Sequence, residues 1–207
     1  MIAKDLVDVV VTDELRDVIR GELSPELNEI TDVELRDLVV EAWATAIAHS
    51  SFNAISELRA SGVWHSDRLK NGTQADHLRG VTATAMGMAD AMMVQFPEIP
   101  LDRDIMIAGS LCHDVGKPYE FDPVRMAARK NSPSKAGWPM LRHPPYGVHI
   151  CLTVGLPEEV AHIAAGHSYE GEVLSRSAAC TIVHFADKGY WATMRASDLM
   201  VDDYEAE

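Results

Sequence analysis

A series of histidine and aspartate residues is the feature that most restricts how this chain of 207 residues can fold. The members occur in a fixed order along the chain: His77, the adjacent pair His113-Asp114, His143, His167 and Asp187. A single His-Asp pair carries little information, because about one arises by chance in a chain of this composition. The ordered series, in contrast, predicts a fold that gathers these side chains at a buried metal site.

The residue types in the series indicate which metal ions the site suits. Imidazole nitrogens together with carboxylate oxygens suit Mn, Fe, Ni, Co or Zn, whereas an all-oxygen set would point to Ca or Mg. Asp114 has two carboxylate oxygens, so it could bridge two ions about 3.5–4 Å apart, as in two-metal hydrolysis. We therefore expect one or two divalent transition-metal ions as the cofactor.

The residues around His113 predict that a helix ends at this site. Neighbouring side chains on a helix are separated by about 100°, so two of them reach one ion most easily near a helix end. Gly116 suits the position just after a helix C-terminus, and Pro118 cannot continue a helix. The sequence therefore predicts one helix over residues 105–115 that stops at the His-Asp pair.

Hydrophobic periodicity predicts an all-α protein. Apolar residues recur at helical spacing over residues 7–19 and 35–46, and a long helix begins near Gln74, carries His77 and ends before Pro97. Shorter segments complete the prediction: helices over residues 53–60, 124–130, 149–154, 157–166 and 175–197, and loops over 64–73 and most of 119–145. No Gly-x-Gly motif occurs, so metal and side chains would have to bind any phosphate.

The same residues carry a resemblance to a known family. The histidine and aspartate series, with Gly116-Lys117 after its central pair, resembles the HD-domain superfamily of metal-dependent phosphohydrolases. The resemblance covers about residues 75–195, more than half of the chain. The segment Arg142–Gly147 looks like the family's His-Pro segment and Ala186-Asp187 like its terminal Ala-Asp. The segment His167–Glu170 departs from the His-His-Glu of many dinuclear members.

The resemblance implies two groups of metal ligands. The first ion would be bound by four residues: His77, His113, Asp114 and Asp187. The second ion would be bound by His143 and His167, with Asp114 bridging the two ions. Asp187 could also orient the attacking water, and Lys117 lies close enough to the pair to meet a phosphate. Asp114, Asp187 and Lys117 are thus the expected catalytic residues.

Three side chains are expected to bind the substrate, and each has an ordinary alternative. Lys117 could instead be a surface lysine. His184 lies three residues before Asp187, so a helix would put both on one face, in contact with substrate or behind a ligand. Arg142 ends a stretch rich in Lys and Arg that begins at Arg125, beside the predicted anion-processing site. A solvated basic loop is the alternative there.

We expect ordinary structural or surface positions for the remaining histidines and for one arginine. His149 and His162 each lie five or six residues from a favoured ligand, and we expect a hydrogen-bonded, partly buried side chain at both. His49 and His65 are expected at the surface or in loops. Arg79 lies two residues after His77, so it points away from the metal and is expected to pair with a carboxylate.

Composition favours an intracellular protein without selecting a substrate. The formal net charge of −14 argues against binding of nucleic acid polymers and anionic membranes. The N-terminus lacks a secretory signal, no stretch has the apolar length of a membrane span, and the three cysteines suit reduced core thiols. We expect a cytoplasmic HD domain over residues 61–207, with a helical extension over 1–60 that caps it or forms a homo-oligomer interface.

The expected function is a metal-dependent hydrolase. Its most direct form is a phosphohydrolase that cleaves a small phosphorylated metabolite or nucleotide with a metal-activated water. A di-iron oxygenase of the HD type acting on a small molecule is one alternative, because such proteins use the same ligands with dioxygen. A non-catalytic regulatory HD module is the other, although such a module would be expected to have lost ligands.

Overall fold

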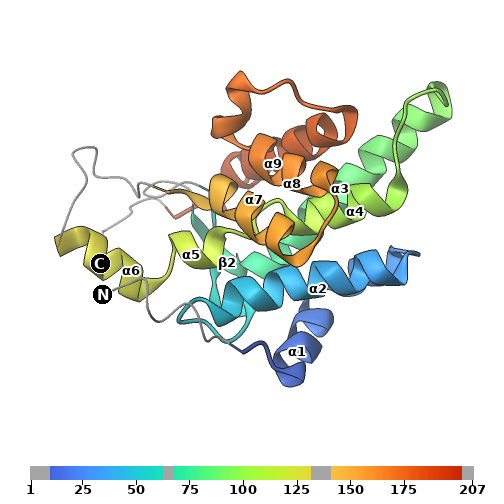
Figure 1. Ribbon diagram of the computed structural model, residues 1–207. Helices are drawn as coiled ribbons and strands as arrows, with labels where there is room; N and C mark the ends of the chain where they lie inside the picture. The colour runs from blue at the N-terminus through green and yellow to red at the C-terminus, as the bar shows by residue number, and fades with distance from the viewer. Residues whose placement is uncertain (1–9, 63–67, 132–140, 202–207) are drawn as a thin grey trace.

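The computed structural model describes residues 10–62, 68–131 and 141–201. The described α-helices are α1 (Asp13–Leu23), α2 (Val33–Ala48), α3 (Gln74–Gln95), α4 (Arg103–Cys112), α5 (Lys117–Glu120), α6 (Pro123–Asn131), α7 (His143–Val154), α8 (Glu158–Gly166) and α9 (Ala178–Ala196). They are joined by the 3₁₀ helices η1 (Glu26–Glu29), η2 (Ile55–Glu57) and η3 (Tyr169–Val173), and by the strands β1 (Arg59–Ser61) and β2 (Arg68–Thr73). Figure 1 shows the helical bundle that results, so the all-α prediction is confirmed.

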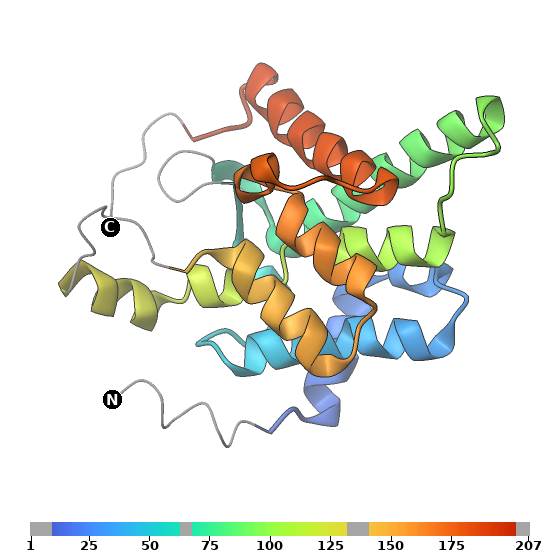
Figure 2. The same ribbon diagram turned by 45° about the horizontal axis from the view of Figure 1, so that its top comes forward.

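Helix α4 lies at the centre of this bundle. It contacts α2, α3, α8 and α9 (Figure 2), and all its residues from Met106 to Cys112 are buried. Gly109 lets α8 approach closely, because a Cβ at this position would overlap the side chain of Ile163. A helix that is apolar on all sides is stable only inside the protein. The His-Asp pair therefore follows the most enclosed helix of the fold.

The N-terminal helices pack on the same core as the rest of the chain. Helix α1 contacts α2 and α3, while α2 contacts α4 and α7. The buried indole of Trp43 in α2 donates a hydrogen bond from Nε1 to the carbonyl oxygen of Leu111 at 2.8 Å. One continuous apolar cluster runs from Ile19 to Ala186. The domain division at residue 60 stays a prediction.

A two-stranded sheet replaces the helix and loop expected before α3. The helix expected over residues 53–60 is wrong, because the chain forms η2 and then β1. The loop expected over residues 64–73 is also wrong from Arg68 onward, where β2 pairs antiparallel with β1. Ala60 and Leu69, one from each strand, pack against Trp191 in a small second cluster. This contact with α9 is tertiary, so local periodicity could not reveal it.

The helix ends around the site also differ from the prediction. Helix α4 stops at Cys112, and residues 113–116 form turns before the short helix α5. Pro118 lies in the first turn of α5, where its missing N–H is not needed. Helix α7 begins at His143 rather than at residue 149, and the predicted loop is correspondingly shorter.

The other predicted helices are confirmed with shifted ends. Helix α1 begins at Asp13 rather than at residue 7, and residues 7–9 lie outside the described part of the chain. Helices α2, α3, α6, α8 and α9 occur where the periodicity placed them.

Among the described residues, no helix has the length and apolar character needed to cross a membrane.

Candidate metal centre

Five segments bring the six predicted ligands together. They are His77 from α3, His113 and Asp114 from the turn after α4, His143 from the first turn of α7, His167 from the end of α8, and Asp187 from α9. The four histidines and Asp114 are at most 2% exposed. The Asp187 side chain is 14% exposed, which makes it the member of the set that solvent reaches best.

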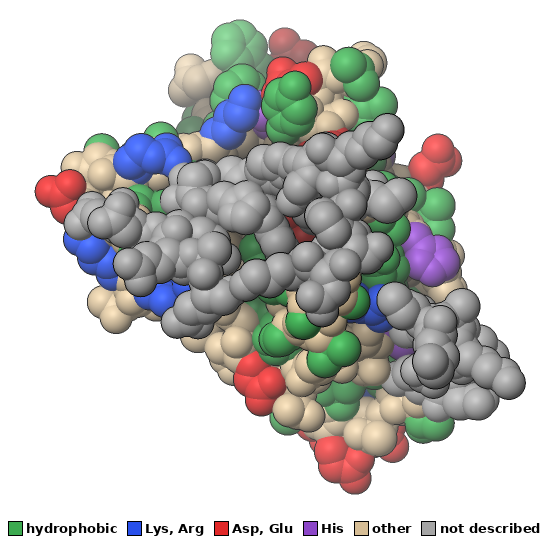
Figure 3. All heavy atoms as spheres, turned by 90° about the vertical axis from the view of Figure 1, so that its left-hand side faces the viewer, with side chains coloured by type: hydrophobic (Ala, Val, Ile, Leu, Met, Phe, Trp, Pro, Cys, Tyr) green, Lys and Arg blue, Asp and Glu red, His purple; other side chains and the backbone are tan. Residues whose placement is uncertain are grey.

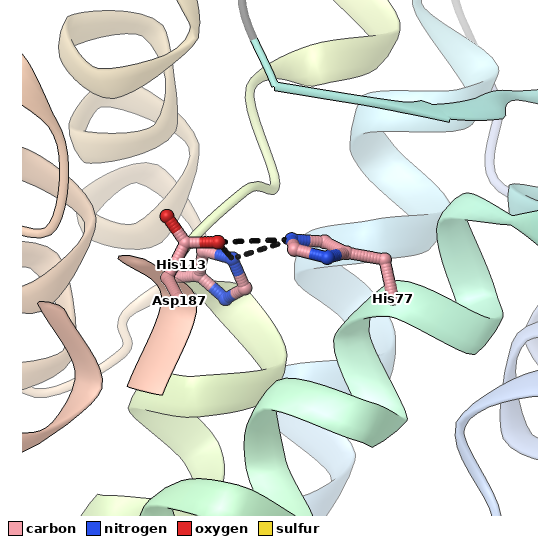
Figure 4. A group of neighbouring side chains, drawn as sticks. All are labelled: His77, His113 and Asp187. Carbon is pink, nitrogen blue, oxygen red and sulfur yellow. Dashed lines mark hydrogen bonds and ion pairs between the residues drawn. The ribbon is translucent and has the colours of Figure 1, made fainter. Parts of the chain in front are cut away.

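His77, His113 and Asp187 form one side of the centre. Nε2 of His77 lies 3.3 Å from Nε2 of His113 and 3.3 Å from Oδ1 of Asp187. Figure 4 shows the His77 ring reaching from α3 toward the other two side chains. The potential ligand atoms of these three residues all lie within 4.8 Å of one another, which suits a single bound ion.

A second group consists of His113, Asp114 and His167, whose potential ligand atoms also all lie within 4.8 Å of one another. Oδ1 of Asp114 lies 3.5 Å from Nε2 of His167 and 3.4 Å from Nε2 of His143. Its other oxygen, Oδ2, lies 3.2 Å from Nε2 of His77 and 3.3 Å from Nε2 of His113. The two oxygens of Asp114 thus face different pairs of histidines, as a bridging carboxylate requires.

Hydrogen bonds behind the rings determine which nitrogen faces the centre. Nδ1 of His113 donates to the carbonyl oxygen of Ser110 at 2.6 Å, and Nδ1 of His167 donates to that of Ala164 at 3.0 Å. A carbonyl oxygen can only accept, so the ring proton of both residues is on Nδ1. Their Nε2 lone pairs are therefore free for a metal ion.

Buried polar atoms without partners support a bound cation. Oδ1 of Asp187, which faces Nε2 of His77, is buried and makes no hydrogen bond among the described residues. Nδ1 of His77 also lacks a partner there, but it is the other nitrogen, Nε2, that faces the centre. The His77 ring contacts Tyr190 and Trp191, whose ring centroids lie 4.7 and 4.9 Å away. Leaving such atoms unpaired is costly, and an ion beside Asp187 would satisfy its free oxygen. The mixed nitrogen and oxygen set fits a divalent transition-metal ion.

The family profile described as HD domain matches residues 75–189, which include all six of these residues. The chain belongs to the HD-domain family. The resemblance inferred from the sequence is thereby confirmed, and HD domains bind divalent metal ions.

One curated protein resembles this HD-domain chain over most of its length. Dihydroneopterin 2',3'-cyclic phosphate phosphodiesterase of Methanocaldococcus jannaschii is 31% identical over 169 residues. The aligned region covers 77% of this chain and 64% of that protein, so the chain spans less than two thirds of its relative. No solved structure matches the chain at a significant level.

Lys117 and Gln74 contact the carboxylate of Asp114 in this HD domain. Nζ of Lys117 lies 2.6 Å from Oδ2 of Asp114 and also donates to the carbonyl of Ser61. Nε2 of Gln74 donates to the same oxygen of Asp114 at 2.9 Å. Burial raises the pKa of Asp114, but Lys117 and His113 outweigh it and hold that pKa well below its usual range. Sequence reasoning missed Gln74, although it lies one helical turn before His77.

Glu120 is a second buried residue that sequence reasoning missed. It accepts hydrogen bonds from His143 and forms an ion pair with Arg142. Burial raises the pKa of Glu120, but the hydrogen bonds from His143 and the charge of Arg142 lower it to about 2. Arg142 lies between Glu120 and Glu170, and its predicted contact with substrate stays a prediction.

The other predicted side chains lie outside the ligand set. Nδ1 of His184 contacts the carbonyl oxygen of His167 at 2.5 Å, so His184 supports a proposed ligand from behind. Arg79 pairs with Glu26 at 2.8 Å, as expected. His162 accepts a hydrogen bond from the backbone of Ser177, also as expected. His65 and the side chains of residues 129–140 in the basic stretch lie outside the described part of the structure.

Proposed function

We propose that this HD domain is a metal-dependent phosphohydrolase that cleaves a phosphodiester bond in a small nucleotide-like molecule. The observation that carries the proposal is the position of Asp114 between two pairs of buried histidines, with Lys117 beside it. That arrangement combines metal ligands with a cation in one enclosed site. The cytoplasmic location and the homo-oligomer stay predictions.

The proposed ligands divide into two sets that share Asp114. The first ion would be held by His77, His113, Asp114 and Asp187. The second would be held by His143 and His167 together with Asp114. Divalent ions held there would act as Lewis acids and lower the pKa of water, so that it can attack phosphorus near neutral pH.

The protein side chains would orient the reactants around these ions. Lys117 brings a buried positive charge next to Asp114, where it would attract an anionic phosphoryl group and stabilise charge that develops during cleavage. Asp187 is the most exposed of the six residues, so substrate and water would reach the centre from its side. An Asp187 oxygen there would also orient the attacking water.

The substrate class is inferred from the relative. Its name describes hydrolysis of a 2',3'-cyclic phosphate, a small cyclic phosphodiester attached to a pterin. We infer that this chain's own substrate is likewise a small cyclic phosphodiester. The similarity to a phosphodiesterase also favours hydrolysis over the oxygenase alternative.

A substrate screen tests the proposal. The purified protein would be stripped with a chelator, reloaded separately with Mn, Fe(II), Co, Ni or Zn, and incubated with 2',3'-cyclic nucleotides, 3',5'-cyclic nucleotides, mononucleotides and sugar phosphates. We expect at least one metal to support hydrolysis of a cyclic diester. Intact substrates throughout, in protein shown to hold metal, would contradict the proposal. Oxygen uptake dependent on an added metabolite would favour the oxygenase instead.

A matched pair of variants makes the screen specific. His113→Ala removes a proposed ligand of the first ion and should abolish hydrolysis. His162→Ala removes a partly buried histidine of α8 that contacts the backbone of Ser177, outside the centre. The second variant should retain activity, and equal loss in both variants would point to unfolding rather than to loss of the centre.

A further inference from the structure

We propose that Glu120 is a positioning residue that prepares His143 to bind the second metal ion. This inference rests on the proposed function, since it assumes that the centre holds two ions. In this proposal Glu120 affects only one of the two ligand sets, the set that contains His143.

Glu120 holds His143 by two hydrogen bonds to a single oxygen. Its Oε2 accepts from the backbone N–H of His143 at 2.7 Å and from Nδ1 of the ring at 2.5 Å. An ionised carboxylate can only accept, so the ring proton is on Nδ1. The Nε2 lone pair then faces Oδ1 of Asp114, 3.4 Å away. Glu120 thus fixes both the tautomer and the direction of the ring.

The position of His143 in its helix explains why it needs this partner. His113 and His167 lie at the ends of α4 and α8, and each ring bonds the carbonyl three residues earlier in its own helix. His143 is the first residue of α7, so no preceding turn of that helix can supply a carbonyl. A partner must come from another element, and Glu120 of α5 supplies it.

Arg142 compensates the buried charge of Glu120. Glu120 is fully buried, and Nε of Arg142 lies 3.3 Å from its Oε1, which leaves Oε2 for His143. The other end of the guanidinium lies 2.6 Å from Glu170, three residues after His167. The ion pairs of Arg142 with Glu120 and Glu170 thus connect the segments that carry His143 and His167. These contacts lie on the side of His143 and His167, so their loss should affect the second ion selectively.

Metal titration of three variants tests the inference. Chelator-treated protein would be dialysed against increasing Mn²⁺, and the bound metal measured by elemental mass spectrometry. Wild type should bind two ions per chain. Glu120→Gln should keep the first ion and bind the second about 10- to 100-fold more weakly, the usual effect of losing such an outer carboxylate. The double variant Glu120→Gln/His143→Ala should match His143→Ala alone, because Glu120 acts through His143.

Asp122→Asn is the matched control. Asp122 is also a buried carboxylate, two residues after Glu120, but it accepts its hydrogen bonds from Ser51 and Arg125. This variant should bind both ions as wild type does, even if its stability falls. If Glu120→Gln does not fold, Glu120→Asp can replace it. This variant keeps the negative charge that pairs with Arg142, but its shorter side chain moves the carboxylate oxygen away from the His143 ring. It should also weaken the second ion.

Three outcomes would overturn the inference. The first is a folded Glu120→Gln protein that binds both ions with wild-type affinity, and the second is one that loses both ions equally. The third is a wild-type protein that binds one ion only, which would leave a single-ion hydrolase standing. Wild type that binds no ion after reconstitution would instead contradict the proposed function itself.

Discussion

Gly116 lies where the loop after the His-Asp pair passes against the first turn of α7. A Cβ at this position would overlap the carbonyl oxygen of His143 and lie 2.8 Å from the backbone nitrogen of Gly147. Its φ is −82°, so any residue could adopt the backbone conformation. The close approach of two backbones, rather than a helix cap, is therefore what requires glycine here.

Gly116→Ala should destabilise the protein and disturb His143. The overlap is with backbone, which cannot move aside cheaply, so we expect a loss of about 2–3 kcal/mol in the free energy of unfolding. Gly87→Ala is the control, because a Cβ at Gly87 in α3 meets nothing within 4 Å and should stabilise the helix by about 0.5–1 kcal/mol. Urea unfolding of the metal-free proteins measures both, and equal effects would contradict the prediction.

Individual residues differed in how far the sequence revealed them. The six proposed ligands could be found because their types and order form a series. Glu120 could not, since the chain has 32 acidic residues and nothing local marks the one that is buried behind His143. Gln74 was missed for a similar reason, although its spacing from His77 offered a signal. Both depend on contacts between segments far apart in the chain.

At the scale of elements, α2 supports the end of the helix that leads to the His-Asp pair. Carbonyl groups in the last turn of a helix lack partners within that helix. The indole of Trp43 satisfies the carbonyl of Leu111, two residues before His113, while both are buried. The N-terminal helix α2 therefore supports the end of the helix that precedes the His-Asp pair.

Trp43→Phe should lower the free energy of unfolding by about 2–3 kcal/mol, since it leaves a buried carbonyl unpaired and a small cavity. Ile47→Val, a buried position in the same helix, should cost only about 1 kcal/mol. Metal affinity should fall in the first variant and not in the second. Denaturant unfolding and metal titration check this, and unchanged metal binding in folded Trp43→Phe would contradict the role given to α2.

Asp104 gives the start of α4 a pH-dependent link to the segment before α2. Its carboxylate accepts hydrogen bonds from Thr31 and from the backbone of Asp32 at 2.8–3.0 Å. Partial burial raises the pKa of Asp104, but these hydrogen bonds outweigh it and lower the pKa. A lowered folded-state pKa means that the stabilisation is present above the unfolded pKa, about 4, and is lost as the pH falls through the folded value.

Asp104→Asn should therefore destabilise the protein by about 1 kcal/mol at pH 7, a modest value because the site is largely exposed to solvent. The difference from wild type should shrink as the pH is lowered below about 4. Urea unfolding at several pH values measures it. A difference that stays constant down to pH 3 would show that the charge of Asp104 is not involved.

Element prediction worked where the pattern was long and failed where it was short. The periodicity of α2, α3 and α9 was sufficient because each helix buries a repeated set of apolar residues. Strand β1 has three residues, too few to show alternation. Its place depends on β2, and the isolated bridge between Leu69 and Met200 ties β2 in turn to the segment after α9. No local signal carries that information.

The molecule combines a large apolar core with a strongly negative net charge. The core cluster includes residues of α1 and α2 as well as those around the metal centre. The formal net charge is −14, yet Figure 3 shows basic as well as acidic side chains exposed on one face.

Residues 61–207 should not fold on their own. Removing residues 1–60 would expose the faces of α4 and α7 that α2 covers and would delete Trp43 and its hydrogen bond. We expect the shortened chain to lack a cooperative thermal transition, which circular dichroism can follow. A sharp transition with helix content like that of the full chain would show that the N-terminal helices form a separable extension.

A metal ion bound by the buried histidine and aspartate residues should be required for phosphodiester hydrolysis. The most direct measurement is the rate of hydrolysis of a 2',3'-cyclic nucleotide by chelator-treated protein as Mn²⁺ is added back, in wild type and His113→Ala. We predict no hydrolysis before metal is added, recovery in wild type as the ions bind, and none in the variant. Hydrolysis that continues unchanged in the stripped protein, or in folded His113→Ala, would contradict a requirement for the metal ion.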